Sequence, residues 1–336
     1  SLGDYTRLTP QGTAREGNDG YNLSFGGQNN RYNAIYIDGA VNNDVFGLAG
    51  SGTNGGQTGV SPIALDAIEE IQVSLAPFDV RIGGFGGAAI SAITRSGTNN
   101  FEGSAYSFFR NENFVRQDLE GAEIQEFDAT TYGFRVGGPI IKDKLFFFAN
   151  AEIQRETTPL PFDSDDYIGD SDLNKLNQLG DFLRNQYGYE PGTFTNNERF
   201  LDSEKLNLKF DYNLNQNNKL ALRFGWVQAD NLEGVQSDRD DIRFLNASER
   251  FLSNTYSSTL EWNSIINSTM SNNLTVGYTL VRDDRDPNGQ PFPYVNIADG
   301  SGEIIFGSEQ FSTANLLDQD ILTINDNFQV YAGKHT

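Results

Sequence analysis

The residues best suited to chemistry in this sequence are clustered carboxylates. The stretch "FDSDDYIGDSD" places five aspartates within ten residues, and carboxylate oxygens are ligands that Ca²⁺ prefers. Their spacing departs from the calcium loop of an EF-hand, so a solvated acidic loop competes with the calcium interpretation. The candidate calcium ligands are Asp163, Asp165, Asp166, Asp170 and Asp172.

Other chemistries lack the residues that they need. The 336 residues include no Cys and one His, His335, which excludes thiolate nucleophiles, cysteine metal sites and His-based triads. The glycine-rich stretch 83–87 is followed by a strand-like segment and not by Lys-Ser/Thr, so tight turns explain it better than phosphate binding. No nucleophile–base pair stands out, so we expect no enzyme and no cofactor apart from the candidate Ca²⁺.

Charge and hydropathy narrow the class of protein. A net charge of −22 disfavours nucleic acid as a partner, because phosphate backbones bind to basic surfaces. The longest apolar run is "LFFFA", far short of the roughly 18–20 residues of a membrane helix. A mean hydropathy of −0.49 is typical of soluble proteins, but transmembrane β-barrels also have low values because apolar and polar residues alternate along their strands.

Strict alternation of this kind dominates the chain after residue 100. In "EKLNLKFDYNLNQ" every second residue from Leu206 to Leu214 is apolar, and the residues between them are Asn, Lys or Asp. Five further segments, within residues 131–140, 220–227, 256–266, 274–280 and 327–332, repeat the pattern. A period of two predicts strands with one apolar and one wet face.

The connections between these strands alternate in length. The short ones are residues 141–144, 215–219 and 267–272, and the long ones are roughly residues 112–129, 157–203, 230–253 and 283–319. Short turns at one end and long loops at the other are typical of a bacterial outer-membrane barrel and not of a soluble sandwich. The wet face therefore borders a lumen or a polar plug.

The first hundred residues predict a small α+β unit. A short strand ends in an Asp-Gly turn at Asp38, Ser61 begins a short helix that continues to about Ala67, and strands follow at 70–75 and 88–95. "FEGSAYSFFRN" is then the first barrel strand, with either Tyr106 and Phe108 or Phe101 and Phe109 toward lipid. The predicted fold is all-β dominated: a transmembrane antiparallel β-barrel, represented by about eight strands of a larger barrel, with an α+β plug in its lumen.

Several stretches resemble a known family. "NNRYNAIYIDGAVNND", "LDAIEEIQVSLAPFDVRIGGFGGAAISAITRSGTNNFEGSAYSFFRN" and "YGFRVGGPIIKDKLFFFANAE" are similar to TonB-dependent outer-membrane transporters of the Oar-like group. The resemblance is densest over residues 29–152. The sequence departs from the family pattern mildly at Ala76 and Ser91, and neither the TonB box nor the carboxypeptidase-like domain of the family is recognisable within these 336 residues.

The resemblance implies a plug domain at 1–100, lacking its N-terminal part, and the N-terminal strands of the barrel at 101–336. Family barrels have 22 strands, and an eight-stranded lumen is too narrow for the plug. Because open sheet edges cannot face lipid, we expect further strands or an assembly machine to cover both edges.

The function implied is TonB-dependent import of a solute, with peptides as the candidate class, by rearrangement of the plug in the barrel lumen. The expected partners are outer-membrane lipid, TonB and a surface lipoprotein, and the expected location is the bacterial outer membrane. Long loops would then be extracellular, and the short turns and the plug start periplasmic. A surface-binding or adhesion barrel without transport is the alternative.

Two sets of site residues follow from this interpretation. The loop after the Asp-Gly turn would be a plug apex that contacts substrate, or else a flexible connector; its residues are Asn42, Asn43, Asp44 and Phe46. Plug arginines could form ion pairs with lumen-facing wall carboxylates, or the wall charges could simply be solvated; the candidates are Arg81, Arg95, Glu152 and Glu261. The long loops would form an acidic vestibule, with a surface helix near 172–188 that packs on neighbouring loops.

Overall fold

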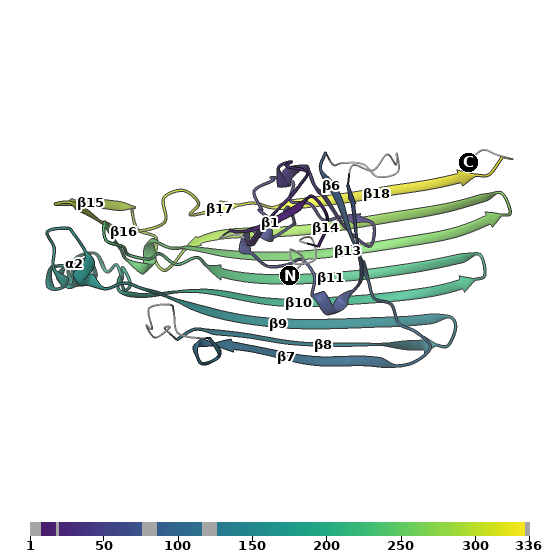
Figure 1. Cartoon of the computed structure of the whole chain (residues 1–336), viewed down its shortest axis with the longest axis horizontal. Helices are drawn as coiled ribbons and strands as arrows, with labels where there is room; N and C mark the ends of the chain where they lie inside the picture. Colours follow the sequence, from purple (N-terminus) through teal and green to yellow (C-terminus); the bar gives the residue numbers. More distant parts are fainter. Residues whose placement is uncertain (1–7, 18–19, 76–85, 116–125, 333–336) are drawn as a thin grey trace.

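The structure is a computed structural model that describes residues 8–17, 20–75, 86–115 and 126–332. Long antiparallel strands form one extended sheet, called the wall below (Figure 1). A smaller unit from the first hundred residues, the plug, lies against one face of the wall, and a helix with three short strands lies at one end. No helix in the described part of the chain is long and apolar enough to cross a membrane.

The wall contains eight long strands in the order in which they occur along the chain. Each strand pairs with its neighbours in antiparallel register. The two-residue β17 pairs with β14 at Asp284 and Arg285, and β18 pairs with β14 from Met270 to Val281. Among the described residues β7 and β18 are the edges and do not pair with each other, so the barrel is partial and not closed. The strands are β7 (Glu102–Asn111), β8 (Asp128–Ile141), β9 (Leu145–Pro161), β10 (Asn196–Asn215), β11 (Asn218–Leu232), β13 (Glu249–Asn267), β14 (Met270–Pro287), β17 (Asn315–Leu316) and β18 (Gln319–Val330).

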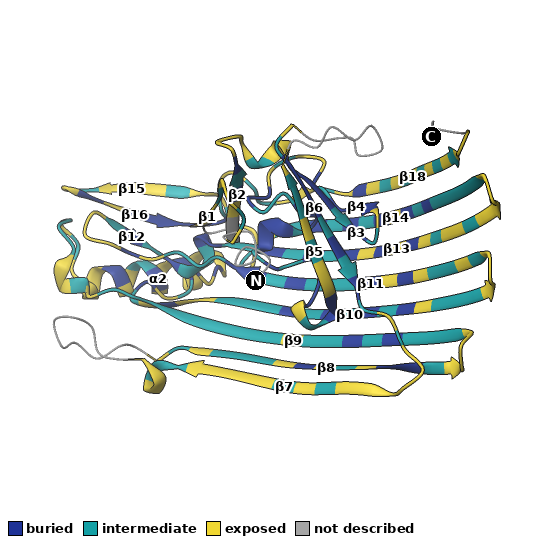
Figure 2. Cartoon of the chain, turned by 45° about the vertical axis from the view of Figure 1, so that its right-hand side comes forward, coloured by how far each residue is buried: buried dark blue, intermediate teal, exposed yellow. Residues whose placement is uncertain are grey.

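Burial in the wall is the reverse of that in a soluble protein. On β10 the polar residues Lys205, Asn207 and Lys209 are buried, whereas the apolar Phe210 and Leu214 are 41% and 46% exposed. Figure 2 shows the same alternation of buried and exposed positions along neighbouring strands. Apolar rows turned outward and polar rows turned inward are the pattern of a membrane barrel, as the alternation predicts.

The structure resolves which aromatic residues of β7 face the lumen. The Tyr106 hydroxyl donates a hydrogen bond to Glu152 Oε2 at 2.6 Å, and the Tyr106 and Phe108 rings are 5.4 Å apart. Phe101 contacts Phe147 on the opposite face, with ring centroids 6.3 Å apart. Tyr106 and Phe108 therefore face inward, and the odd-numbered aromatic residues face the lipid.

The plug contains a two-stranded and a four-stranded sheet. Its predicted Asp-Gly turn is confirmed, with left-handed φ values of 48° at Asp38 and 79° at Gly39. Two apolar clusters form its core, and one of them includes Phe148 from the wall strand β9. The strands are β1 (Gly12–Gly17), β2 (Gly20–Phe25), β3 (Ala34–Ile37), β4 (Ala40–Val41), β5 (Ile68–Leu75) and β6 (Ala88–Thr94), with the four-stranded order β4-β3-β6-β5.

The predicted helix from Ser61 to Ala67 is wrong except for its last turn. Only a 3₁₀ turn, η3 (Leu65–Ala67), is present, because the Ser61 hydroxyl donates to the Ile63 carbonyl and does not cap a helix. Ile63 and Ala67 are buried against β6, so burial of these side chains holds the segment in an irregular path. Two other short turns of this region are η1 (Asn30–Tyr32) and η2 (Gly56–Thr58).

The long loops are shorter than predicted, and three of them fold together. β9 continues to Pro161 and β10 begins at Asn196, because ladder pairing continues beyond the alternating part of the sequence. The remaining loop segments form a loop domain with its own buried core. This core consists of Leu176, Leu183, Tyr189, Phe194, Ile242, Phe244, Ile304 and Phe306. Its elements are η5 (Ser164–Asp166), α2 (Leu173–Tyr187), β12 (Asp241–Arg243), η6 (Leu245–Ala247), β15 (Val295–Asp299) and β16 (Gly302–Phe306). The predicted surface helix that packs on neighbouring loops is confirmed as α2.

Candidate functional site: the interface between plug and wall

Asp38 of the plug is the centre of a buried ionic contact with the wall. Its carboxylate accepts hydrogen bonds from the backbone N–H and the hydroxyl of Thr94, at 2.9 and 2.6 Å, which hold it in place. Lys209 Nζ on β10 and Arg223 Nε on β11 lie 3.6 and 3.7 Å from its two oxygens. All three charged side chains are less than a tenth exposed, so each compensates a charge that would otherwise be buried without a partner.

A second carboxylate, Asp66, joins the plug to the first two wall strands. Asp66 Oδ2 accepts a hydrogen bond from Ser104 Oγ on β7 at 2.9 Å, and Asp66 Oδ1 lies 3.3 Å from Arg135 Nε on β8. Arg135 also donates to Ser104, which closes a three-membered network. These side chains are about one-quarter exposed, so solvent screens this ion pair more than that of Asp38.

The plug apex, the loop that carries the predicted substrate contacts, is held by its own polar residues. The Asp44 carboxylate accepts backbone N–H groups from Phe46, Leu48 and Ala49 at 3.1, 2.7 and 2.9 Å. Asp44 also accepts from Gln319 Nε2 at 3.2 Å. Because the Asp44 carboxylate accepts four hydrogen bonds, it stabilises the conformation of this loop, and its role is structural.

The other predicted apex residues differ in their exposure. Asn43 bridges β3, because its side chain accepts from the Ile35 N–H and donates to the Asn33 carbonyl. Asn42 is buried, and its side-chain oxygen has no hydrogen-bond partner among the described residues, whereas Phe46 is 46% exposed. Of the four residues Phe46 is thus the one that is exposed, and the substrate-contact role remains a prediction.

A third polar contact joins the plug to the loop end of the wall. Gln57 accepts a hydrogen bond from Arg285 on β14, and Arg285 also pairs with Glu249 of β13 at 3.1 Å. The plug backbone comes close here, since a side chain on Gly55 would meet Ser253 Oγ at 2.7 Å. Gln57, Gly55 and Asp44 contact the loop ends of β13, β14 and β18, which orients the plug apex toward the long loops.

The predicted plug–wall ion pairs form with other partners. Arg95 pairs with Glu69 inside the plug, and Glu152 pairs with Lys205 inside the wall at 2.7 Å. Glu261 accepts hydrogen bonds from the amides of two neighbouring asparagines, at 2.8 and 2.9 Å. Arg81 lies outside the described residues. The charges in these contacts are therefore the opposite of those predicted: the plug supplies the carboxylates of Asp38 and Asp66, and the wall supplies the cations.

The acidic loop shows another use for its carboxylates. Asp163 caps η5 by accepting the Asp165 N–H at 3.0 Å, and Asp172 caps α2 by accepting the Lys175 N–H at 2.9 Å. Asp166 and Asp170 lie in the same loop, but their carboxylates do not converge with those of Asp163 and Asp172 on a common point. In the part of the chain that the structure describes, no three His, Cys, Asp or Glu side chains gather as a metal site, and Ca²⁺ binding remains untested.

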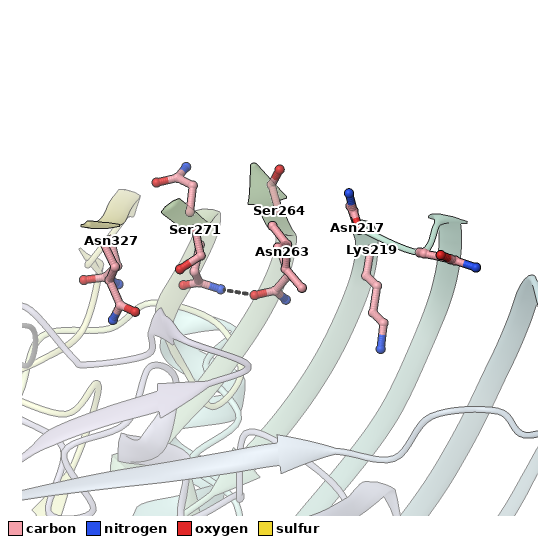
Figure 3. A pocket seen from close by; sticks show the side chains of 11 residues that line it. Asn217, Lys219, Asn263, Ser264, Ser271 and Asn327 are labelled. Atoms are coloured by element: carbon pink, nitrogen blue, oxygen red, sulfur yellow. Dashed lines mark hydrogen bonds between the residues drawn. The ribbon is translucent and has the colours of Figure 1, made fainter. Parts of the chain in front are cut away.

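At the turn end, the wall has a cavity of about 550 Å³ whose lining is rich in amides. Figure 3 shows Asn217, Lys219, Asn263 and Asn327 there, on neighbouring strands and turns. Asn273 donates to the Asn263 side chain at 2.7 Å. Among the described residues no carboxylate lines this cavity and Lys219 is the one charged lining residue, so the lining offers mainly neutral donors and acceptors.

Sequence patterns do not identify the carboxylates that hold the plug. Alternation indicated correctly that Lys209, Arg223 and Arg135 face inward, and a buried cation requires an anionic partner. Many plug and wall carboxylates could have served that role. The position of Asp38 at a tight turn and of Asp66 in a 3₁₀ turn was the available signal, but only the docked plug brings them to these cations.

Parts of this sequence are similar to known outer-membrane proteins. Residues 93–164 match the family model described as an outer membrane beta barrel domain. The TonB-dependent transporter Oar of Myxococcus xanthus is 30% identical over 146 residues, which cover 39% of this chain and 12% of that protein.

Solved structures show the same fold. The outer membrane transporter YddB of Escherichia coli aligns with a TM-score of 0.61 at 12% identity, over 97% of this chain and 42% of that one. The ferric enterobactin receptor PfeA of Pseudomonas aeruginosa aligns with a TM-score of 0.59 at 15% identity, over 98% of this chain and 44% of that one. This chain therefore spans well under half the length of these relatives.

The comparisons confirm the resemblance to TonB-dependent outer-membrane transporters and the partial β-barrel fold. They also confirm the outer-membrane location. The relatives are transporters and receptors, which is consistent with a protein that is not an enzyme.

Proposed function

We propose that this chain forms the plug and the first wall strands of a TonB-dependent importer, which moves a peptide-class solute across the outer membrane by rearranging the plug. Further strands of the same protein would complete the barrel beyond β7 and β18. The long loops and the plug apex would face outward, and the turn end would face the periplasm, where TonB acts.

The polar character of the plug–wall interface is the observation that supports this proposal best. Asp38, Asp66 and Gln57 bind the wall through ion pairs and hydrogen bonds, and the apolar contribution of the wall to the plug core is Phe148. Polar contacts can be replaced by water when a segment moves, whereas exposing an apolar interface costs about 25 cal/mol per Å². Such an interface suits a plug that must shift and return.

The loop domain favours the alternative, a surface-docking barrel. Its buried core, with Phe244 and Tyr189 almost fully enclosed, gives the outer end a defined shape. A rigid surface of this kind could bind a partner such as a surface lipoprotein without any transport. The two functions differ in whether TonB is required.

Uptake by cells tests the proposal. Cells that produce the full-length protein, with and without TonB, would be incubated with a tryptic casein digest, and peptides in periplasmic extracts would be quantified by mass spectrometry. We expect a subset of peptides to accumulate only when both the protein and TonB are present. Accumulation without TonB would indicate a passive pore, and absence of accumulation would favour the docking function.

A further inference from the structure

The outer end of the molecule carries most of its negative charge. Residues 157–203, 230–253 and 283–319 hold 22 Asp and Glu against 7 Lys and Arg, so these three ranges account for 15 of the 22 net negative charges. Charge concentrated around an opening raises the local concentration of counter-charged solutes and their association rates. The entrance is therefore electrostatically selective for cations.

A groove on the loop domain shows how these carboxylates are presented. It has a volume of about 530 Å³ and is lined by Asp163, Asp165, Asp166 and Asp238, with Arg239 as the only basic lining residue. Asp165 and Asp166 are exposed. They are free of the capping role of Asp163, so they can face a cationic ligand directly.

The plug apex adds an apolar element to this acidic entrance. Val45, Phe46 and Leu48 are 62%, 46% and 48% exposed, although large apolar side chains are usually buried in a plug core. Asp44 holds the loop that carries them, and Gln319 of β18 ties that loop to the loop end of the wall. The backbone that carries the exposed side chains is thus held in place, which lowers the ordering cost of binding.

The turn end contrasts with the entrance. Its cavity is lined by amides, hydroxyls and Lys219, with no carboxylate among the lining residues (Figure 3). Glu261 lies behind this lining and accepts hydrogen bonds from the amides of Asn263 and Asn273, so the described lining residues offer a cation neutral acceptors.

We infer that the solute is a cationic peptide that carries at least one apolar side chain, with its charges facing the acidic loops and its apolar side chain on Val45, Phe46 and Leu48. This inference rests on the proposed function. An anionic peptide of the same length would be repelled by the loops, and a cationic peptide without an apolar residue would leave the apex unpaired.

Equilibrium binding tests this inference without TonB. Purified full-length protein in detergent would be titrated into two fluorescein-labelled octapeptides, KLKGKLKG and ELEGELEG, and anisotropy would be recorded. We expect the lysine peptide to bind about tenfold more tightly at 50 mM salt, with the difference shrinking as salt screens the charges. Asp165→Asn with Asp166→Asn should weaken the lysine peptide several-fold.

The control removes the same number of charges from the turn end. Asp143→Asn with Asp326→Asn, both exposed and remote from the loops, should leave the affinity unchanged. Phe46→Ser should weaken both peptides. Equal binding of the two peptides, a salt-independent preference or no binding of either would overturn the inference, while TonB-dependent uptake of neutral peptides in the cellular assay would leave the proposed function standing.

Discussion

At the scale of single residues, Asp38 is a buried plug carboxylate whose position is set by both its turn and the wall. It sits at a left-handed turn position that Asp tolerates better than most residues, and it faces two buried cations from different wall strands. Removing one partner of a buried ion group costs about 3–5 kcal/mol, because the remaining charges lose their compensation. Its charge therefore decides how firmly the plug is docked.

Replacing this charge gives a residue-scale prediction. Asp38→Asn keeps the shape and the turn conformation but leaves Lys209 and Arg223 facing a neutral amide, so the plug should loosen. Liposomes containing the full-length variant should leak small solutes faster than those containing the wild type. Glu261→Gln is the control, since Glu261 bonds only to wall asparagines among the described residues, and equal leakage of the two variants would contradict the role of Asp38.

At the scale of elements, strand parity separates two neighbouring phenylalanines on β9. Phe148 faces the lumen, is 4% exposed and belongs to a plug core cluster, whereas Phe147 faces outward beside Phe101. The two residues differ in position by a single step along the strand. Their substitution thus tests whether the wall contributes to plug stability through one face only.

We expect Phe148→Ala to destabilise the plug by about 3–5 kcal/mol, the usual cost of removing a buried phenyl ring. Hydrogen exchange of β6 amides in the full-length protein should accelerate, because the cluster contains Ala92 of that strand. Phe147→Ala should leave β6 exchange unchanged. Acceleration by both variants to the same extent would show that general wall damage, and not the plug contact, is responsible.

At the scale of the whole molecule, the proposed import requires the plug to move relative to the wall. The sequence contains no Cys, so an engineered pair can form only one disulfide. A Cβ placed on Gly55 would lie 3.8 Å from Ser253 Cβ, which matches disulfide geometry, although its φ of +65° adds about 1 kcal/mol of strain. This position links the plug apex to β13.

Gly55→Cys with Ser253→Cys should abolish TonB-dependent uptake under oxidising conditions, and dithiothreitol should restore it. Gly103→Cys with Val136→Cys is the matched control, because its 4.0 Å Cβ separation joins two wall strands and leaves the plug free. Uptake by the oxidised control should equal that of the wild type. Full uptake by the oxidised plug–wall variant would exclude a mechanism in which the apex leaves the wall.

The sequence by itself determined the wall. Alternation predicted the strands β8, β10, β11, β13, β14 and β18, and the inward face of Lys209 and Arg223, because a strand has only two faces and lipid accepts only one kind of side chain. Local signals also predicted the turn at Asp38 and the helix α2. These features depend on neighbours within a few residues or on a simple period.

Only the tertiary structure decided which charges meet. Asp38 and Lys209 are 171 positions apart, and the sequence offered Arg95 and Glu152 as equally reasonable partners until the docked plug paired each of them elsewhere. The same holds for the three loops, whose shared core joins residues from separate parts of the chain. The sequence shows that buried cations need anionic partners and that apolar side chains need a core. Long-range packing selects which residues meet, because many carboxylates could neutralise the same cation.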